Sequence, residues 1–387
     1  MCEHAWVFES SLKACDVESE VMLPSDDESL MLGRKYTTGK ECYPALLTTG
    51  DIIRQIKQRD FNPEKSAFFM PTANGPCRFG CYHLLHRFVL DDLGYKDIPI
   101  AILDQDRDFD KAINNVDPIF EKLAWWGIVA VDSLEKLLYQ TRPYEVNKGD
   151  SDKLFREAIN ELRKCIQKRS KPYNLLKDCR KKFDEIPVRG KGSRPKIGIV
   201  GEIYVRLNPF SNDYLVRKIE ELGGEVSIAT MGEWVNYITL ARSWRNKRLR
   251  LYSKYLKDKI RSFYQRYIEK KQNRLAGVEL DASPEELFKY AQKYIHPSFQ
   301  GEAILTIGKT VEYILNNEVT GIINTMPFTC MPGIIVTAIL KKIIEDFGEV
   351  PCITISYAGQ QALNSHIRLE AFLFQAREYH LAHSLSK

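Results

Sequence analysis

Short apolar runs alternate with amphipathic segments along most of the chain. The segments between the runs carry apolar residues at helical spacing. We expect strands at 66–70, 98–103, 197–201, 225–229, 321–324 and 352–356 and helices at 48–57, 81–93, 211–222, 242–273, 333–347 and from 365, with residues 109–183 mainly helical. Strands that alternate with helices predict an α/β fold with parallel sheets and helices on both faces.

The segment VRGKGSRPK at 188–196 is the best candidate for a linker, since two glycines and a proline lie among basic residues. A strand pattern begins directly after it. We therefore predict two domains, an N-terminal α/β domain with a helical extension at 1–190 and a C-terminal α/β domain at 191–387. The two would face each other across a cleft, and ligands of open α/β sheets bind outside the carboxyl ends of the strands.

Composition narrows the class of protein. The 387 residues are 44% hydrophobic and 28% charged, which favours a folded core over disorder, and the net charge of +5 does not indicate a nucleic-acid partner. No run approaches about eighteen apolar residues, so we expect no membrane span. The N-terminal sequence MCEHAWVFESSLKACD does not have the pattern of a signal peptide. We expect a cytoplasmic protein whose nine cysteines are reduced thiols or metal ligands.

Three cysteines share one context, a position just after a strand or just before a helix. They are Cys42, Cys77 and Cys330. The free N–H groups and the positive dipole end of a helix N-terminus favour thiolate over thiol and donate hydrogen bonds to sulfur. Cys81 lies four residues after Cys77, so it would share a helix face with it and reach the same centre.

The other cysteines and two histidines allow plainer interpretations. We interpret Cys15, Cys165, Cys179 and Cys352 as small packing residues. We expect His83 and His86 to have surface or core packing roles, but a structural zinc site built from Cys77, Cys81, His83 and His86 stays open as an alternative.

The segment RSWRNKRLRLYSKYLKDKIRSFYQRYIEKK at 242–271 is rich in lysine, arginine and aromatic residues. Such a mixture can bind phosphates and stack bases, so nucleic-acid binding is an alternative function. We favour an amphipathic helix whose apolar residues face the core, namely Leu249, Tyr252, Leu256, Ile260, Phe263 and Tyr267. Its basic face would then be available to an acidic partner.

Four stretches of sequence resemble a known family. They are GKECYPALLTTGD, FFMPTANGPCRFGCYHLLHRFVLDDLGY, GEIYVRLNPFSNDYLVRKIEELGGEV and NTMPFTCMPG. They resemble the 2-hydroxyacyl-CoA dehydratase / benzoyl-CoA reductase superfamily, and within it most of all the dehydratase-like C-terminal region of large CoA-substrate-specific enzyme activases. The resemblance covers nearly the whole chain, with the motifs in the same order.

The resemblance implies two Rossmann-like domains with additional helices and an oxygen-sensitive [4Fe-4S] cluster in the cleft between them. Its ligands would be Cys42, Cys77 and Cys330, with the fourth iron open. A double-cubane cluster needs more cysteines, so we expect a single cluster. Cys81 departs from the activase-linked relatives, which have glutamine there. If Cys81 binds the fourth iron the cluster is closed and relays electrons, and otherwise that iron is free for substrate.

The resemblance also implies a function. An ATP-hydrolysing activase of the actin/hexokinase type would inject one low-potential electron, and this chain, which has no phosphate-binding glycine loop, would accept it. The cluster would pass the electron to an acyl-CoA thioester, whose ketyl radical anion then loses its hydroxyl group. Arg78, beside Cys77, would stabilise thiolate or developing negative charge, with a surface salt bridge as the alternative. An electron relay or regulatory protein without its own substrate stays open, as do a homodimer and a second subunit.

Overall fold

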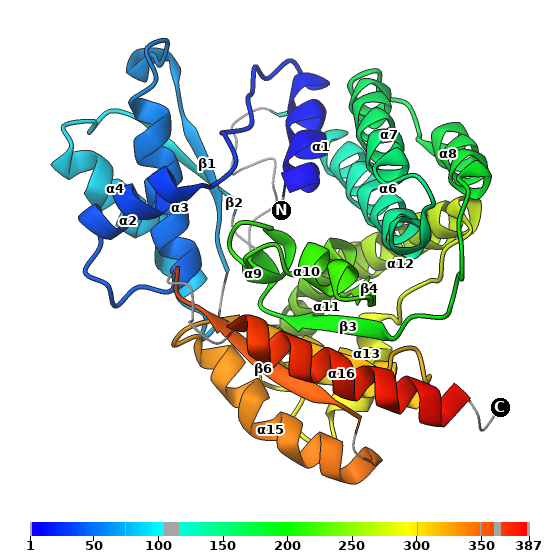
Figure 1. The fold of residues 1–387 in the computed structure, drawn as a ribbon. Coiled ribbons are helices and arrows are strands. Elements are labelled where there is room, and N and C mark those ends of the chain that lie inside the picture. The colour runs from blue at the N-terminus through cyan, green and yellow to red at the C-terminus, as the bar shows by residue number, and fades with distance from the viewer. Residues whose placement is uncertain are drawn as a thin grey trace.

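The computed structural model describes residues 2–73, 75–103, 116–299, 301–348, 350–359 and 365–384 (Figure 1). In the first half of the chain the elements are α1 (Cys2–Lys13), α2 (Asp27–Tyr36), α3 (Tyr43–Ile56), η1 (Pro63–Lys65), β1 (Phe68–Pro71), η2 (Arg78–Cys81), α4 (Tyr82–Asp92), β2 (Ile100–Leu103), α6 (Phe120–Thr141), η3 (Arg142–Tyr144), α7 (Asp150–Gln167) and α8 (Tyr173–Glu185). The start of the predicted helical region, at 109–115, lies outside the described residues.

The second half begins with a strand directly after the predicted linker. Its elements are β3 (Lys196–Gly201), α9 (Ile203–Leu207), α10 (Leu215–Glu221), β4 (Glu225–Ile228), α11 (Met231–Arg248), α12 (Tyr252–Ala276), α13 (Pro284–Ala291), α14 (Glu302–Leu315), β5 (Gly321–Pro327), α15 (Met331–Phe347), β6 (Cys352–Tyr357) and α16 (Ser365–Ser384). All six predicted strands are present, so the sequence located the strands well.

The second half contains a parallel sheet with strand order β4-β3-β5-β6. The adjacent residues Ile322 and Ile323 of β5 are fully buried and belong to different apolar clusters. Helices α14 and α15 contribute to the first cluster, and α10 and α16 contribute to the second. This sheet therefore has helices on both faces, and the predicted α/β class is confirmed.

The order of the strands indicates where a ligand of this sheet would bind. From β3 the chain moves to β4 on one side, and it later adds β5 on the other side of β3. The direction of winding therefore changes between β3 and β5. The crevice outside the carboxyl ends of two such strands is where open α/β sheets bind ligands. Here β3 ends at Gly201 and β5 ends at Pro327.

The first half holds a smaller sheet in the described residues. Strands β1 and β2 pair in parallel, with Phe68 opposite Ile100. Helix α4 contacts both strands and α3, while α2 packs along α3. The division of the chain at residue 190 stays a prediction, because α12 of the second half packs against α6 and α8 of the first half.

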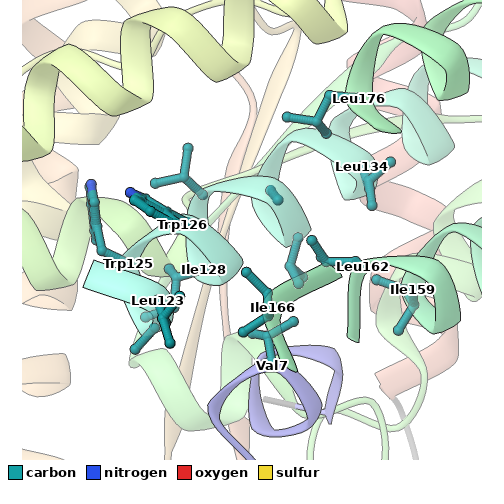
Figure 2. Packing of buried hydrophobic residues seen from close by; sticks show 14 of the residues in the cluster. Val7, Leu123, Trp125, Trp126, Ile128, Leu134, Ile159, Leu162, Ile166 and Leu176 are labelled. Carbon is teal, nitrogen blue, oxygen red and sulfur yellow. The ribbon is translucent and has the colours of Figure 1, made fainter. Parts of the chain in front are cut away.

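A helical bundle connects the two halves. Its buried cluster includes residues of α1, α6, α7, α8 and α12, and Figure 2 shows how closely the apolar side chains of α6 pack with Val7 of α1 and with Ile159, Leu162 and Ile166 of α7. Two tryptophans of α6 reach α12, since Trp125 Nε1 donates to the carbonyl of Gln265 at 3.2 Å and Trp126 Nε1 donates to the Tyr264 hydroxyl at 2.7 Å.

Helix α12 packs through its polar face. Its buried residues are Asp258, Gln265, Ile268, Glu269, Gln272, Asn273 and Ala276. Asn273 accepts a hydrogen bond from Ser133 of α6 at 2.9 Å, and Gln272 donates to the carbonyl of Trp126 at 3.2 Å. Asp258 accepts from Arg242 and Asn246 of α11 at 2.9 and 2.8 Å.

The apolar residues that were expected to face the core are on the outside of this region. Leu249, Tyr252, Leu256, Ile260, Phe263 and Tyr267 are all exposed. That prediction is wrong, because hydrogen bonds from the opposite, polar face of α12 fix the helix on α6 and α11. The region 242–273, expected to form one or two long helices, contains the end of α11 and most of α12, separated at residues 249–251.

None of the helices in the described ranges is long and apolar enough to cross a membrane.

Candidate functional site

The three predicted ligands each occupy the residue before a helix. Cys42 is the N-cap of α3, Cys77 that of η2 and Cys330 that of α15. A proline lies in the first turn of both α3 and α15, where its missing N–H costs nothing. Cys42 and Cys330 are buried and Cys77 is partly buried. The prediction that these cysteines lie at helix starts is confirmed.

Arg78 brings the three cysteine loops together. Its guanidinium donates to the carbonyl of Lys40 at 2.8 Å, and to the carbonyl and hydroxyl oxygens of Thr329 at 2.8 and 3.1 Å. Arg78 follows Cys77, Lys40 lies two residues before Cys42, and Thr329 directly precedes Cys330. One side chain thus connects all three loops, and it links the first half of the chain to the carboxyl end of β5.

The thiols are near enough to influence one another. Burial raises the pKa of Cys77 to about 12, and the charge of Cys42 adds to this rise. Burial likewise raises the pKa of Cys330, with Cys77 among the contributing charges. Burial also raises the pKa of Cys42, although the hydroxyl of Tyr82 and the amide of Ala45 oppose it.

The expectation that the helix N-termini favour thiolate is therefore only half right. Backbone amides of Ala45, Phe79 and Gly333 do lower the pKa of the cysteine that each faces. Loss of water around the sulfurs outweighs these amides, so the thiols are neutral without a bound cation. A metal centre that binds the sulfurs would displace their protons.

Tyr82 is an additional polar contact of the site. It is buried at the start of α4, and its hydroxyl makes a short hydrogen bond with Cys42 Sγ. Burial, followed by the charge of Cys42, raises the pKa of Tyr82. The phenol therefore keeps its proton and is available to donate to sulfur.

Two carboxyl groups, those of Glu202 and Glu302, influence the pKa of the cysteines. Glu202 follows β3 and caps α9 by accepting from Tyr204 N and Val205 N at 3.2 and 2.9 Å. Glu302 is the first residue of α14, and burial raises its pKa to about 8, with the charge of Glu202 adding to the rise. Both carboxyls raise the pKa of Cys77 and of Cys330, so both lie near these thiols.

This acidic region has polar atoms without a partner. Within the described part of the chain, Glu302 Oε1, Glu233 Oε2 and Arg206 Nε are buried and have no hydrogen-bond partner. Arg206 uses its Nη1 on the carbonyl of Gly201 at 2.8 Å. Buried groups of this kind usually contact water, an ion or a ligand, so the region is equipped to hold a polar molecule.

Backbone strain marks the same end of the sheet. Thr329, directly before Cys330, has φ +62°, an unusual conformation for a β-branched residue. Gly201 has φ +112°, and a Cβ there would lie 2.0 Å from the carbonyl oxygen of Thr325. Such strain persists where neighbouring contacts impose it, as Arg78 does at Thr329. The loops after β3 and β5 are thus held in defined conformations.

Cys81 and the two histidines take different positions from the three buried or partly buried cysteines. Cys81 is exposed at the end of η2. His86 is buried, its Nε2 lies 3.1 Å from Thr48 Oγ1, and burial lowers its pKa to about 4. The ligand atoms of Cys77, Cys81, His83 and His86 include no three within 4.8 Å of one another. The alternative zinc site is therefore not formed. The sulfurs of Cys42, Cys77 and Cys330 are not all within 4.8 Å of one another either, and the feature that connects their loops is Arg78.

Cys15, Cys179 and Cys352 pack against apolar clusters, as expected. Cys15 and Cys179 are buried in the helical bundle. Cys352 is partly buried against the cluster of α14 and α15, and Cys165 contacts the carbonyl of Ser170 at 3.3 Å.

Among the described residues, one group of three does have its ligand atoms within 4.8 Å of one another, namely His4, Asp132 and Glu135. His4 Nε2 lies 2.9 Å from Asp132 Oδ1. The Asp132 carboxylate also accepts from the first two amides of α11, Met231 N at 3.2 Å and Gly232 N at 2.9 Å. Because these bonds already occupy both oxygens, we interpret the group as a structural contact among α1, α6 and α11.

The sequence did not indicate every residue of the site. It assigned no role to Tyr82, Thr329 or Glu302. Tyr82 directly follows Cys81 and Thr329 directly precedes Cys330, so their positions in the motifs were a usable signal. Glu302 lies far from any cysteine in sequence, and only the fold brings it to the site.

Comparison with known proteins leaves the family open: no family model matches the chain, and no curated protein matches it.

Proposed function

We propose that the protein is an iron–sulfur redox protein of the kind its sequence motifs resemble. It would accept a low-potential electron from an ATP-hydrolysing activase and pass it to an acyl-CoA substrate, as a dehydratase or reductase component. The proposal includes two Rossmann-like domains with the cluster in the cleft between them. It also includes the superfamily itself, the 2-hydroxyacyl-CoA dehydratase / benzoyl-CoA reductase superfamily.

The observation that carries the proposal is the arrangement around Arg78. Three cysteines that lie far apart in sequence are on loops that one side chain connects, because Arg78 bonds to the backbone beside Cys42 and beside Cys330. The site adjoins the carboxyl ends of β3 and β5, the edge at which an α/β sheet binds its ligands. Isolated packing cysteines give no reason for such a connection between their loops.

The donor set fits an iron–sulfur cluster better than a single ion. Thiolates are the usual ligands of such clusters, and amide hydrogen bonds to sulfur tune their potential. The sulfurs of Cys42, Cys77 and Cys330 are not all within 4.8 Å of one another. Three thiolates on one zinc ion would be about 4 Å apart, given Zn–S bonds of about 2.3 Å in a tetrahedron. The three sulfurs therefore do not have the spacing of a single zinc site.

Each neighbouring side chain then has a defined task. When bound, the cluster would supply one-electron chemistry at low potential. Tyr82 would donate its hydroxyl proton toward Cys42 Sγ, and Arg78 would hold the loops together while its positive charge faces Cys42. Glu202 and Glu302 would keep the interior side of the site polar.

Three ligands rather than four would leave one iron available. Cys81 is exposed, whereas Cys42 and Cys330 are buried and Cys77 is partly buried. This difference favours an open iron position and direct substrate chemistry. An electron relay with Cys81 as the fourth ligand is the second candidate, and it requires Cys81 to turn inward.

The test is anaerobic purification, with iron and sulfide quantified and EPR spectra recorded after dithionite reduction. We expect about four irons per chain, lost in Cys77→Ala and retained in Cys179→Ala. The control replaces a buried cysteine of the helical bundle. Cys81→Ala should keep its iron and its EPR signal if the site is open.

Zinc without sulfide, or equal iron in Cys77→Ala and Cys179→Ala, would contradict the cluster. If the cluster is present, adding an activase, ATP and acyl-CoA thioesters tests the reaction itself. A cluster that is reduced by the activase but transfers no electron to any thioester would favour the relay.

A further inference from the structure

The outward face of α12 carries an apolar row that no described part of the chain covers. It consists of Tyr252, Leu256, Ile260, Phe263 and Tyr267, which we call the α12 stripe. These side chains are between 51% and 77% exposed. Large apolar side chains aligned along one helix face mark a site of contact with another molecule far more often than scattered ones do.

The stability of α12 in this protein does not require the stripe. The opposite face makes the contacts with α6 and α11, through Asp258, Gln272 and Asn273 among others. A helix that buries polar residues and exposes apolar ones has the reverse of the usual pattern for a surface helix. The apolar face is therefore available for a partner rather than for the fold.

The spacing of the stripe is that of a coiled-coil seam. Leu256, Ile260, Phe263 and Tyr267 follow one another at intervals of four, three and four residues. This is the alternation of d and a positions in a heptad repeat, the row that faces a partner helix. From Tyr252 to Tyr267 the row is about 22 Å long at 1.5 Å per residue. It is one helix wide, which suits a single helix as the occupant.

The charges beside the stripe have one sign. In the same heptad register, Lys257 and Lys271 take e positions and Lys259 takes a g position. Arg266, also at g, pairs with Glu269 of the same helix at 2.9 Å. The acidic residues of α12 are Asp258 and Glu269, and both are buried. Residues at e and g set the choice of partner in coiled coils. Pairing of α12 with a second copy of itself would oppose cation to cation in either orientation.

We propose that the α12 stripe binds an amphipathic helix of a partner protein, with apolar residues at its own a and d positions and glutamate or aspartate beside them. Charge complementarity and heptad spacing both select this occupant. An anionic lipid surface would also attract the cations, but a bilayer accepts apolar side chains at any spacing and gives no reason for the four-three-four intervals. This inference is independent of the cysteine site.

The test uses two synthetic peptides several heptads long, with isoleucine at a and leucine at d. One has glutamate at e and g, and the other has lysine there. Binding to the full chain is measured by fluorescence anisotropy at low and high salt. We expect the glutamate peptide to bind at least about tenfold more tightly than the lysine peptide, with the difference reduced by salt.

Variants locate the binding surface. Ile260→Glu and Phe263→Glu should each weaken the glutamate peptide by about tenfold or more. Phe374→Glu is the matched control, an exposed phenylalanine on α16 that should leave binding unchanged. The double variant Lys257→Glu/Lys271→Glu should reverse the preference in favour of the lysine peptide. All five substituted positions are exposed, and circular dichroism checks that each variant folds.

Three results would overturn the inference. The first is equal binding of both peptides, or binding of neither. The second is binding to phosphatidylserine vesicles that Phe263→Glu abolishes, without binding of the glutamate peptide, which would assign the stripe to a membrane surface. The third is self-association in sedimentation that Ile260→Glu abolishes, which would assign it to a second copy of the chain.

Discussion

The sheet of the second half and the contact between α6 and α12 are both buried, but different forces hold them. The sheet is mainly apolar: all seven residues of β5 are buried, with isoleucines facing both layers of helices, and the two polar residues of this strand, Asn324 and Thr325, are hydrogen-bonded. The contact of α12 instead includes a row of hydrogen-bonded side chains, such as Asn273 with Ser133. Packing of the sheet depends on the volume of its apolar side chains. Packing of α12 on α6 depends on which polar side chains form hydrogen bonds with each other.

This difference predicts how each region responds to change. Apolar interiors tolerate swaps of similar shape and lose stability in proportion to the volume removed. Polar interiors depend on the partner of each donor and acceptor, since an orphaned buried group costs more than the bond was worth. Because α12 makes this contact through its polar face, its apolar face is left exposed.

The largest effect is expected in the sheet. Ile322→Ala removes a fully buried side chain from β5 and leaves a cavity against α14 and α15. We expect a loss of about 2–5 kcal/mol in the free energy of unfolding, measured by urea titration. Ile322→Val, which keeps the shape, should cost only about 1 kcal/mol. Similar losses for the two variants would show that volume does not govern this core.

The contrast also explains what the sequence could predict. Strands of the sheet are short apolar runs, and apolar burial placed all six of them correctly. Helix α13 was missed although Ser283 and Glu286 form a capping box at its start, a signal that local pattern does carry. The predicted orientation of α12 was the reverse of the observed one. Hydrophobicity alone assigns the apolar face to the core, and it does not indicate which polar side chains will form hydrogen bonds with other helices.

The candidate site shows the same limit. Cys42, Cys77 and Cys330 could be chosen from their positions before helices, a local feature. The connection between their loops depends on hydrogen bonds from Arg78 to the carbonyl groups of residues 40 and 329. Every residue has a backbone carbonyl, so the sequence does not indicate which ones Arg78 contacts. The raised pKa values of the thiols depend on burial and on Glu302, which only the assembled fold supplies.

A moderate effect is expected at the polar contact. Asn273→Ala removes the acceptor of the Ser133 hydroxyl and the donor to the carbonyl of Glu279, which lies 3.2 Å away. We expect a loss of about 1–3 kcal/mol, because buried groups lose their partners. The double variant Asn273→Ala/Ser133→Ala should be less destabilised than the sum of the two single variants. Full additivity in urea titrations would contradict a contact that is defined by polar pairing.

A pH dependence should distinguish the same contact from the sheet. Burial raises the pKa of Glu269 to about 7, although nearby Arg266 lowers it. The folded state therefore holds this proton more tightly than the unfolded chain, where glutamate has a pKa of about 4.3. The resulting stability is complete below about pH 4 and is lost as the pH rises through about 7.

Glu269→Gln removes this titration and keeps the size of the side chain. Relative to the wild type, the variant should gain roughly 1–2 kcal/mol between about pH 5 and pH 8, after allowance for relaxation of the buried site. Urea titrations at several pH values measure the difference. Ile322→Val should show no such trend relative to the wild type, and a constant difference for Glu269→Gln would mean that its carboxyl does not titrate in this range.

The smallest effect is expected on the outward face of α12, and it is the sharpest test of the comparison. Phe263 is 77% exposed, and serine has about the same helix propensity as phenylalanine. Phe263→Ser should therefore change the free energy of unfolding by less than about 0.5 kcal/mol, whereas removal of a core phenylalanine costs about 3–5 kcal/mol. A loss of the larger size would mean that the stripe is covered in the isolated protein. If that loss also depended on protein concentration, the cover would be a second copy of the chain, since unfolding would then include dissociation.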